Sequence, residues 1–202
     1  MRVVLATSNR GKQRELAALL APLGLTLELS ADLGIASPEE TGTSFEANAL
    51  LKARHASRLA VLPALADDSG LAVDALDGGP GIYSARYAGL NSDDAANNAR
   101  LLAELAVRPA SQRSARYCCV LALVRHADDP APLLARGSWE GHIALERAGE
   151  GGFGYDPLFI PQGYGQTVAE LPALLKQQHS HRALAAARLV AQLRAGALGG
   201  AG

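Results

Sequence analysis

The feature that most constrains the fold is an alternation of apolar runs with segments of helical periodicity. Residues 117–124 are apolar almost throughout, as is typical of a central strand covered on both faces. Residues 3–6 form a shorter run of the same kind, and Leu16, Leu19 and Leu20 follow at helical spacing. Strands that alternate with helices predict an α/β fold.

Residues 132–144 contain Gly137 and Gly141 and predict a hairpin or meander. A hairpin requires antiparallel pairing, so we expect a mixed sheet flanked by helices. Thr43 and Glu46 have the spacing of a capping box, which predicts a helix over residues 44–59.

A further helix is predicted to begin at Asp93 and Asp94, whose charges suit the positive end of its dipole. Its spacing of small and apolar residues indicates one buried face, formed by Ala96, Ala99, Leu102 and Ala103. The last helix is expected to follow a cap at Ser180.

Length and composition indicate the number of domains, the class of ligand and the location of the protein. The 202 residues suit one domain, with or without two lobes, and residues 195–202 are glycine-rich and predict a flexible tail. A net charge of −1 argues against a broad basic face for nucleic acid. The N-terminal run is too short for a membrane span, and the two cysteines make no framework, so we expect a cytoplasmic protein.

A polar loop follows the first strand and precedes the first helix, where backbone N–H groups can meet an anion. It contains Thr7, Ser8, Asn9, Arg10, Gly11 and Lys12. The loop is not a Walker A motif, because Ala6 replaces its first glycine and Gln13 follows the lysine. The sequence leaves two interpretations open: a phosphate site, or a turn that only caps the helix.

Asp67 and Asp68 are predicted to lie where one strand breaks, between apolar residues 64–66 and the alternating residues 71–75. Paired carboxylates suit Mg²⁺, especially when phosphates supply the other ligands. An Asx turn at a strand end is the structural alternative.

The segment 151–157 combines glycines with Phe153, Tyr155 and Asp156, in a chain with only 4% aromatic residues. One ring can stack on a base, while N–H groups and the carboxylate recognise the edge of that base by hydrogen bonding. The alternative is a glycine-rich turn with core aromatics.

Lys176, His181 and Arg182 lie on or just before the last helix, where the cationic side chains can reach phosphate oxygens. A solvated helix face is the alternative. His179 and His181 have no acid or cysteine partner nearby in the sequence, which disfavours a zinc site.

Taken in order, these motifs resemble the inosine/xanthosine triphosphate pyrophosphatase family over nearly the whole chain. The resemblance is carried by residues 6–12, 39–42, 66–71, 80–87, 151–157 and 180–182. It implies an elongated two-lobed fold with a long central mixed sheet, a nucleotide cleft between the lobes and a homodimer. It also implies Mg²⁺ and hydrolysis of non-standard purine triphosphates (ITP, dITP, XTP) to the monophosphate and pyrophosphate.

Carried over by position, the resemblance makes Asp68 the catalytic acid and a metal ligand, with Glu40 as a second metal-side carboxylate. The implied substrate-binding residues are Thr7, Ser8, Asn9, Arg10, Gly11, Lys12, Ser69, Phe153, Gly154, Tyr155, Asp156, Lys176, His181 and Arg182. The chain departs from the family at Leu174 and Leu175, where acidic residues are usual. A septum-inhibitor-type pyrophosphatase and a non-catalytic nucleotide-binding regulator are the rival functions.

Overall fold

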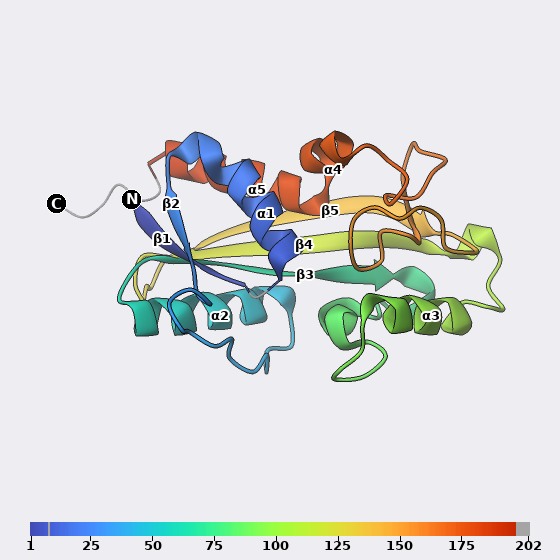
Figure 1. Ribbon diagram of the computed structural model, residues 1–202, viewed down its shortest axis with the longest axis horizontal. Coiled ribbons are helices and arrows are strands. Elements are labelled where there is room, and N and C mark those ends of the chain that lie inside the picture. The colour runs from blue at the N-terminus through green and yellow to red at the C-terminus, as the bar shows by residue number, and fades with distance from the viewer. Residues whose placement is uncertain (8, 197–202) are drawn as a thin grey trace. The chain divides into compact units, whose positions relative to one another are not determined.

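Six strands form one mixed sheet in the order β2-β1-β3-β4-β5-β6 (Figure 1). The computed structural model describes residues 1–7 and 9–196. The strands are β1 (Arg2–Ala6), β2 (Thr26–Leu29), β3 (Ala64–Val73), β4 (Ser114–Val124), β5 (Leu133–Ile143) and β6 (Phe159–Pro161). β1 pairs in parallel with β2 and β3, whereas β5 and β6 are antiparallel. The α/β class and the mixed sheet are confirmed.

Five α-helices flank the strands within the described residues. They are α1 (Arg10–Leu20), α2 (Phe45–Ala60), α3 (Asp94–Glu104), α4 (Ala173–His179) and α5 (His181–Arg194). Short 3₁₀ turns cover residues 21–23, 74–76, 81–86 and 110–112. Among the described residues, no helix has both the length and the apolar character that a membrane crossing requires.

The chain divides into two compact units. Unit 1 comprises residues 1–68, 119–137 and 182–202, and unit 2 comprises residues 69–118 and 138–181. β3, β4 and β5 each contribute residues to both units. The elongated shape and the cleft implied by the resemblance stay predictions, and residues 197–202 of the expected tail lie outside the described part.

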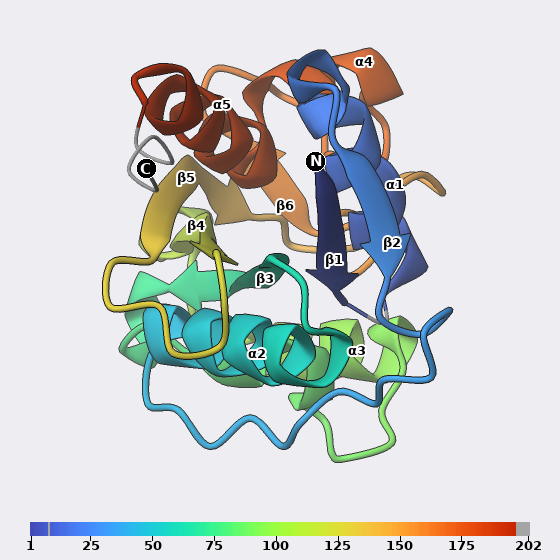
Figure 2. The same ribbon diagram turned by 90° about the vertical axis from the view of Figure 1, so that its left-hand side faces the viewer.

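Unit 1 has a helix layer on each face of its strands. On one face α1 and α5 pack through Leu16, Leu20 and Leu189 against Val3 and Leu5. On the opposite face α2 packs its alanines against a second set of strand residues (Figures 1 and 2). That second set includes Val4, Ala6, Ala64, Ala66, Val120 and Ala122. Both faces of these strands are therefore buried, which explains their continuous apolar runs.

Unit 2 has its own apolar core, in which α3 packs against the strands through Leu101 and Leu105. Tyr117 and Phe159 lie in the same cluster, with their ring centroids 4.7 Å apart in an edge-to-face arrangement. Tyr155, Leu158 and Val168, from the segments that connect the helices and strands, are buried in the same cluster.

The predicted strand break at Asp67 and Asp68 is wrong. β3 runs without interruption from Ala64 to Val73, so both carboxylates lie within the strand. Consecutive residues of a strand point to opposite faces. Each carboxylate is buried, and each meets a lysine on its own face, which allows the strand to continue.

Three smaller expectations also need correction. Ser44, not Thr43, caps α2 by accepting from the Ala47 N–H, and Glu46 pairs with Arg136 as well as with the Ser44 side chain. Residues 133–143 form one strand, β5, so this segment is not itself a hairpin; it lies between β4 and β6, as in a meander.

The predicted inner face of α3 is also wrong. Its buried residues are Asn97, Asn98 and Leu101, whereas Ala96 and Ala99 are exposed. Two asparagines face inward because their side-chain amides bind the backbone of neighbouring loops, which the spacing of apolar residues does not report.

Gly141 of β5 offers a test of the packing between β5 and β6. A Cβ added there would lie 2.3 Å from the Ile160 carbonyl oxygen. This oxygen belongs to the backbone, so the clash can be relieved only by moving a strand. We expect Gly141→Ala to lower the free energy of unfolding by about 1–3 kcal/mol, as overpacked sites do. The matched control is Gly165→Ala, where nothing lies within 4 Å of the added atom. Equal melting temperatures for the two variants would contradict this packing.

Candidate active site

The loop after β1 begins beside the acidic pair. β1 pairs with β3 up to Ala6 and Ala66, so the next residues along the two strands are Thr7 and Asp67. Thr7 Oγ1 accepts from the Asn9 N–H at 3.2 Å, and Asn9 Oδ1 accepts from the Lys12 N–H at 3.0 Å. The capping interpretation of this loop is therefore confirmed for Asn9. Ser8 lies outside the described residues.

Capping does not remove the anion-binding potential of the loop. Asn9 is the cap of α1, and Arg10 and Gly11 are its first two helical residues. N–H groups in the first turn of a helix have no intrahelical partner and carry the positive end of the dipole. The start of α1 can therefore both be capped and bind a phosphate.

Asp67 is the centre of a buried ion-pair network on one face of β3. Lys12 Nζ lies 2.5 Å from its Oδ1, and Arg182 Nε lies 3.2 Å from its Oδ2. Arg182 also pairs with Glu15 of α1. The Cys119 thiol donates to Asp67 Oδ2 at 3.1 Å. Two predicted phosphate-binding cations, from α1 and α5, are thus held by one carboxylate.

The charges of this network decide its protonation. Burial works to raise the pKa of Asp67, but Lys12 and Arg182 outweigh it and hold that pKa well below its ordinary value. Burial likewise opposes the charge of Arg182, but Asp67 raises its pKa above the usual range. Asp67 and Arg182 are therefore both charged at neutral pH.

Asp68 lies on the opposite face of β3 and faces α2. Lys52 Nζ donates to Asp68 Oδ1 at 2.7 Å and to Glu40 Oε1 at 2.8 Å, so it bridges the two predicted metal-side carboxylates. Burial raises the pKa of Asp68, and the charge of Lys52 offsets only part of this effect. Burial also works against the charge of Lys52, but Asp68 and Glu40 raise its pKa.

The second oxygen of Asp68 indicates room for a ligand. Asp68 Oδ2 is buried, and no group in residues 1–7 and 9–196 hydrogen-bonds to it. A buried acceptor without a partner is costly unless a water, ion or ligand satisfies it. No cluster of three or more carboxylate, histidine or cysteine ligands exists in that part of the chain. The donor set therefore fits Mg²⁺, which takes one or two carboxylates and completes its shell with waters and phosphates.

Sequence reasoning missed Lys52 and treated Asp67 only as half of a pair. A compositional signal for Lys52 exists: the chain has three lysines, Lys12, Lys52 and Lys176, among 19 basic residues. All three lie in ion pairs with predicted site carboxylates or with Asp67. All the other residues counted as basic here are arginines. The presence of a lysine in this chain is therefore a signal that the position belongs to an ion pair of the candidate site.

A second cluster lies within unit 2. Lys176 Nζ of α4 is 2.6 Å from Asp156 Oδ2 and 4.2 Å from the centre of the Phe153 ring. The Phe153 N–H donates to Asp156 Oδ2 at 2.9 Å, and the Gly154 N–H donates to Asp94 Oδ2 at 2.6 Å. An aromatic face, a carboxylate and an ammonium group therefore converge in one loop, although two of its N–H groups already have acceptors.

The other predicted residues of unit 2 extend this cluster. Tyr117 donates its hydroxyl hydrogen to Asp156 Oδ1 at 3.3 Å, and its ring stacks on His181 with centroids 4.7 Å apart. Tyr155 is buried and donates its hydroxyl hydrogen to the Ser84 carbonyl oxygen at 2.8 Å. The Tyr155 ring thus belongs to the core, and Phe153 is the partly exposed ring of the segment.

The predicted residues separate into two sets. Unit 1 holds Thr7, Asn9, Arg10, Gly11, Lys12, Glu40, Asp68 and Arg182. Unit 2 holds Ser69, Phe153, Gly154, Tyr155, Asp156, Lys176 and His181. The solvated-face alternative for Lys176, His181 and Arg182 is wrong, because His181 and Arg182 are buried and the Lys176 side chain is only 12% exposed.

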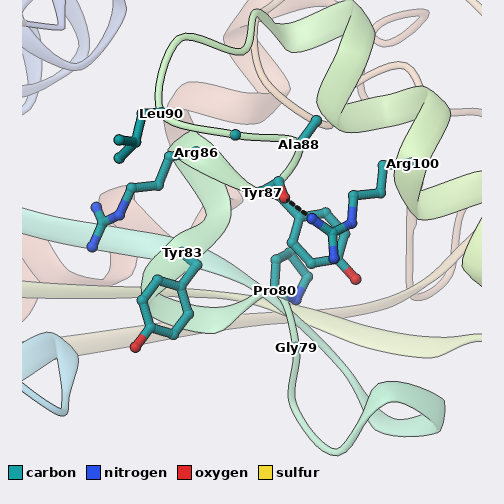
Figure 3. Close-up of a pocket in the computed structure, with 9 residues that line it drawn as sticks. Gly79, Pro80, Tyr83, Arg86, Tyr87, Ala88, Leu90 and Arg100 are labelled. Atoms are coloured by element: carbon teal, nitrogen blue, oxygen red, sulfur yellow. Dashed lines mark hydrogen bonds between the residues drawn. The ribbon is translucent and has the colours of Figure 1, made fainter.

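Another pocket of unit 2 lies apart from these residues in the sequence. It has a volume of about 440 Å³ and is lined by Gly79, Pro80, Tyr83, Arg86, Tyr87, Ala88, Gly89, Leu90 and Arg100 (Figure 3). Arg100 of α3 donates to the Tyr87 carbonyl oxygen and lies over the Tyr87 ring. Residues 80–87, which carry part of the family resemblance, therefore form one wall of this pocket.

The ion-pair network predicts how stability depends on pH. We expect Asp67→Asn to lower the free energy of unfolding at pH 7 by about 3–5 kcal/mol, because it leaves buried cations without their partner. The pKa of Asp67 is lowered in the folded state, so its contribution is present above about pH 4 and declines as pH falls below that value. Denaturant unfolding at a series of pH values checks this.

The control is Asp128→Asn, in an exposed pair with Arg58. It should change stability little at any pH, since exposed pairs contribute little. A stability gap between wild type and Asp67→Asn that widens in acid would contradict the assignment.

Known proteins resemble this chain over almost its full length. The Ham1 family model matches residues 3–192. The dITP/XTP pyrophosphatase of Xanthomonas oryzae pv. oryzae is 54% identical over 193 residues, covering 96% of this chain and 97% of that protein. The dITP/XTP pyrophosphatase of Escherichia coli K12 is 54% identical over 195 residues, covering 96% and 99%.

Among solved structures, a HAM1 protein from Coxiella burnetii superposes with a TM-score of 0.90 at 43% identity, covering 96% of this chain and 99% of the other. The similarity therefore extends over almost the full length in both sequence and fold. These matches show that the chain belongs to the Ham1 family.

Proposed function

We propose that this protein hydrolyses non-standard purine nucleoside triphosphates (ITP, dITP and XTP) to the nucleoside monophosphate and pyrophosphate, with Mg²⁺ as cofactor. Relatives more than half identical over nearly the full chain are named dITP/XTP pyrophosphatases, which supports the substrate class. The observation that carries the proposal is the buried acidic pair, with Asp67 binding Lys12 and Arg182 while Asp68 binds Lys52.

The two clusters suggest a division of labour. We assign the phosphate chain to unit 1, where Lys12, Arg182 and the start of α1 supply positive charge. We assign the base to unit 2, where Phe153 offers a ring face and Asp156 and Lys176 offer hydrogen-bonding groups. Ser69 directly follows Asp68 in β3 and is proposed as a further substrate contact.

Charge balance supports the cofactor. The unit 1 cluster contains three cations (Lys12, Lys52, Arg182) and four carboxylates (Glu15, Glu40, Asp67, Asp68), so when fully ionised it carries one net negative charge. A triphosphate adds several more negative charges. Protein side chains alone therefore leave the complex with a large excess of negative charge, which a divalent cation reduces. Asp68 and Glu40 would hold that cation, and when bound it would supply charge neutralisation at the phosphates.

The proposed reaction uses Asp68 as the base. Asp68 orients a water and accepts its proton while the water oxygen attacks the α-phosphorus; the bond from that phosphorus to the bridging oxygen breaks, and pyrophosphate leaves. Lys52 occupies Oδ1, so the unpartnered Oδ2 is the oxygen proposed to act.

Base selection is proposed to follow from hydrogen-bond complementarity. A 6-oxo purine accepts a hydrogen bond where adenine donates one, so the wrong base leaves a buried protein group unpaired. Lys176 is a donor without acceptor capacity, which suits a 6-oxo group and repels a 6-amino group. Its position beside Phe153 and Asp156 supports this role.

The rival functions make different predictions. The relatives compared above do not favour a septum-inhibitor-type enzyme. A non-catalytic regulator would bind ITP and return it intact. A homodimer, a cytoplasmic location and the absence of nucleic-acid binding stay predictions that follow from the resemblance and the composition.

Replacing the proposed base tests the mechanism. We expect Asp68→Asn to reduce kcat for pyrophosphate release from ITP with Mg²⁺ by about 10³-fold or more, because the base and a metal ligand are lost together. The fold should persist, since Lys52 keeps Glu40 as its partner. Pyrophosphate release and the melting temperature are the two measurements.

The control for this variant is Asp77→Asn, the same change at an exposed turn whose left-handed backbone suits asparagine. It should retain wild-type turnover. Near-normal turnover by Asp68→Asn would show that another group is the base.

Substrate preference provides an independent test. We expect kcat/KM for ITP and XTP to exceed that for ATP by up to about 10⁴–10⁵-fold, the range available to a site built around a specific hydrogen bond. Release of pyrophosphate, rather than of single phosphate, is expected for each hydrolysed nucleotide. Equal kcat/KM values for ITP and ATP would refute the proposed role of unit 2 in base selection.

A further inference from the structure

Helix α3 holds the loop that carries Phe153 through the two backbone polar groups of one residue, Gly154. Asp94 Oδ2 accepts from the Gly154 N–H at 2.6 Å, and Asn98 Nδ2 donates to the Gly154 carbonyl oxygen at 2.8 Å. Asp94 and Asn98 are four residues apart and share one face of α3. Both backbone polar groups of Gly154 are thus fixed by side chains of one rigid element.

The loop requires such an anchor. Gly154 has a φ of +65°, in the left-handed region, and open space surrounds the position of its missing Cβ. Glycine is therefore present here for its backbone conformation and not to avoid a steric clash. Gly149, Gly151 and Gly152 precede it in the same loop. A segment so rich in glycine samples many conformations unless hydrogen bonds restrict it.

Burial of the Asn98 side chain is not explained by packing alone. It is fully buried at 0% exposure, and its Oδ1 has no hydrogen-bond partner in the described part of the chain. A leucine at this position would bury apolar surface without leaving a polar atom unpaired. What asparagine adds is its amide nitrogen, which donates to the Asp94 and Gly154 carbonyl oxygens.

The loop that α3 holds at Gly154 also carries residues of the candidate base-binding cluster. Phe153, directly before Gly154, presents its ring to Lys176, and its N–H donates to Asp156 Oδ2. The Gly154 N–H lies in the peptide that follows Phe153, and the Gly154 carbonyl lies in the next peptide toward Asp156. A change of backbone conformation at Gly154 would therefore redirect Phe153 on one side and Asp156 on the other. The positions of the Phe153 ring and the Asp156 carboxylate decide which edge of a base can be bound.

We propose that Asp94 and Asn98 are positioning residues for base recognition, which fix the backbone on both sides of the Gly154 Cα and thereby set KM and base preference. This inference rests on the proposed function for its kinetic consequences, although the contact itself can be tested without any activity. The phosphate chemistry of unit 1 does not involve either residue.

Asp94 is the residue to substitute, because it is exposed and its loss leaves no buried group unpaired in α3. We expect Asp94→Ala to raise KM for ITP by about 10-fold and to lower the ITP-over-ATP ratio of kcat/KM by a similar factor, the effect of one charge-assisted hydrogen bond. We expect kcat for ITP to change by less than about 3-fold, since only binding and orientation are affected. Inhibition by inorganic pyrophosphate, which lacks a base, should be unchanged.

Two further variants separate positioning from helix stability. Asp94→Asn keeps an acceptor oxygen and should restore most of the KM and the base preference. Asp93→Ala removes the cap of α3, whose side chain accepts from the Ala96 N–H, but leaves the Gly154 contacts intact. It should lower the melting temperature without changing KM or base preference.

Hydrogen exchange at residues 152–156 gives a readout independent of catalysis. Asp94→Ala should accelerate exchange of the Gly154 amide, and Asp93→Ala should not. Wild-type exchange and kinetics in Asp94→Ala, or the same KM shift in Asp93→Ala, would overturn the inference. Failure of the wild-type protein to release pyrophosphate from any purine triphosphate would refute the proposed function, and the exchange measurement would still decide whether Asp94 anchors the loop.

Discussion

The candidate site depends on two consecutive carboxylates buried within an unbroken strand. Asp67 and Asp68 point to opposite faces of β3, so each needs its own positive partner in a place from which water is largely excluded. Lys12 and Arg182 satisfy Asp67, and Lys52 satisfies Asp68. Because these cations come from α1, α5 and α2, the acidic pair fixes what the helices on both faces of unit 1 must contribute.

The same arrangement gives the two carboxylates different chemistry. Cations outweigh burial at Asp67 and lower its pKa, whereas burial outweighs Lys52 at Asp68 and raises its pKa. Asp67 is therefore the anion that holds cations in place at neutral pH, and Asp68 is the member able to exchange a proton or bind a metal at its unpartnered Oδ2. Adjacent residues of one strand can in this way separate positioning from proton transfer.

Much of the fold follows from sequence periodicity, because two-sided burial produces apolar strands such as residues 117–124 and leucines at helical spacing in α1. Three of the failures have a common cause. The break at Asp67, the inner face of α3 and the absence of Lys52 from the expected site all arose where polar residues are buried with distant partners. Periodicity measures apolar burial and cannot report that Asn98 binds Gly154, 56 residues away, or that Lys52 binds Asp68. The scarcity of lysine was the one compositional clue to such contacts.

The most direct test of this account is a crystal structure with Mn²⁺, whose anomalous signal locates the metal, and a non-hydrolysable inosine triphosphate analogue. We predict that the metal binds Asp68 on the α2 face of β3, while Asp67 keeps its contacts with Lys12 and Arg182 and stays away from the metal. A metal bound to Asp67, or phosphates that contact neither Lys12 nor the start of α1, would contradict the division of roles between the two carboxylates.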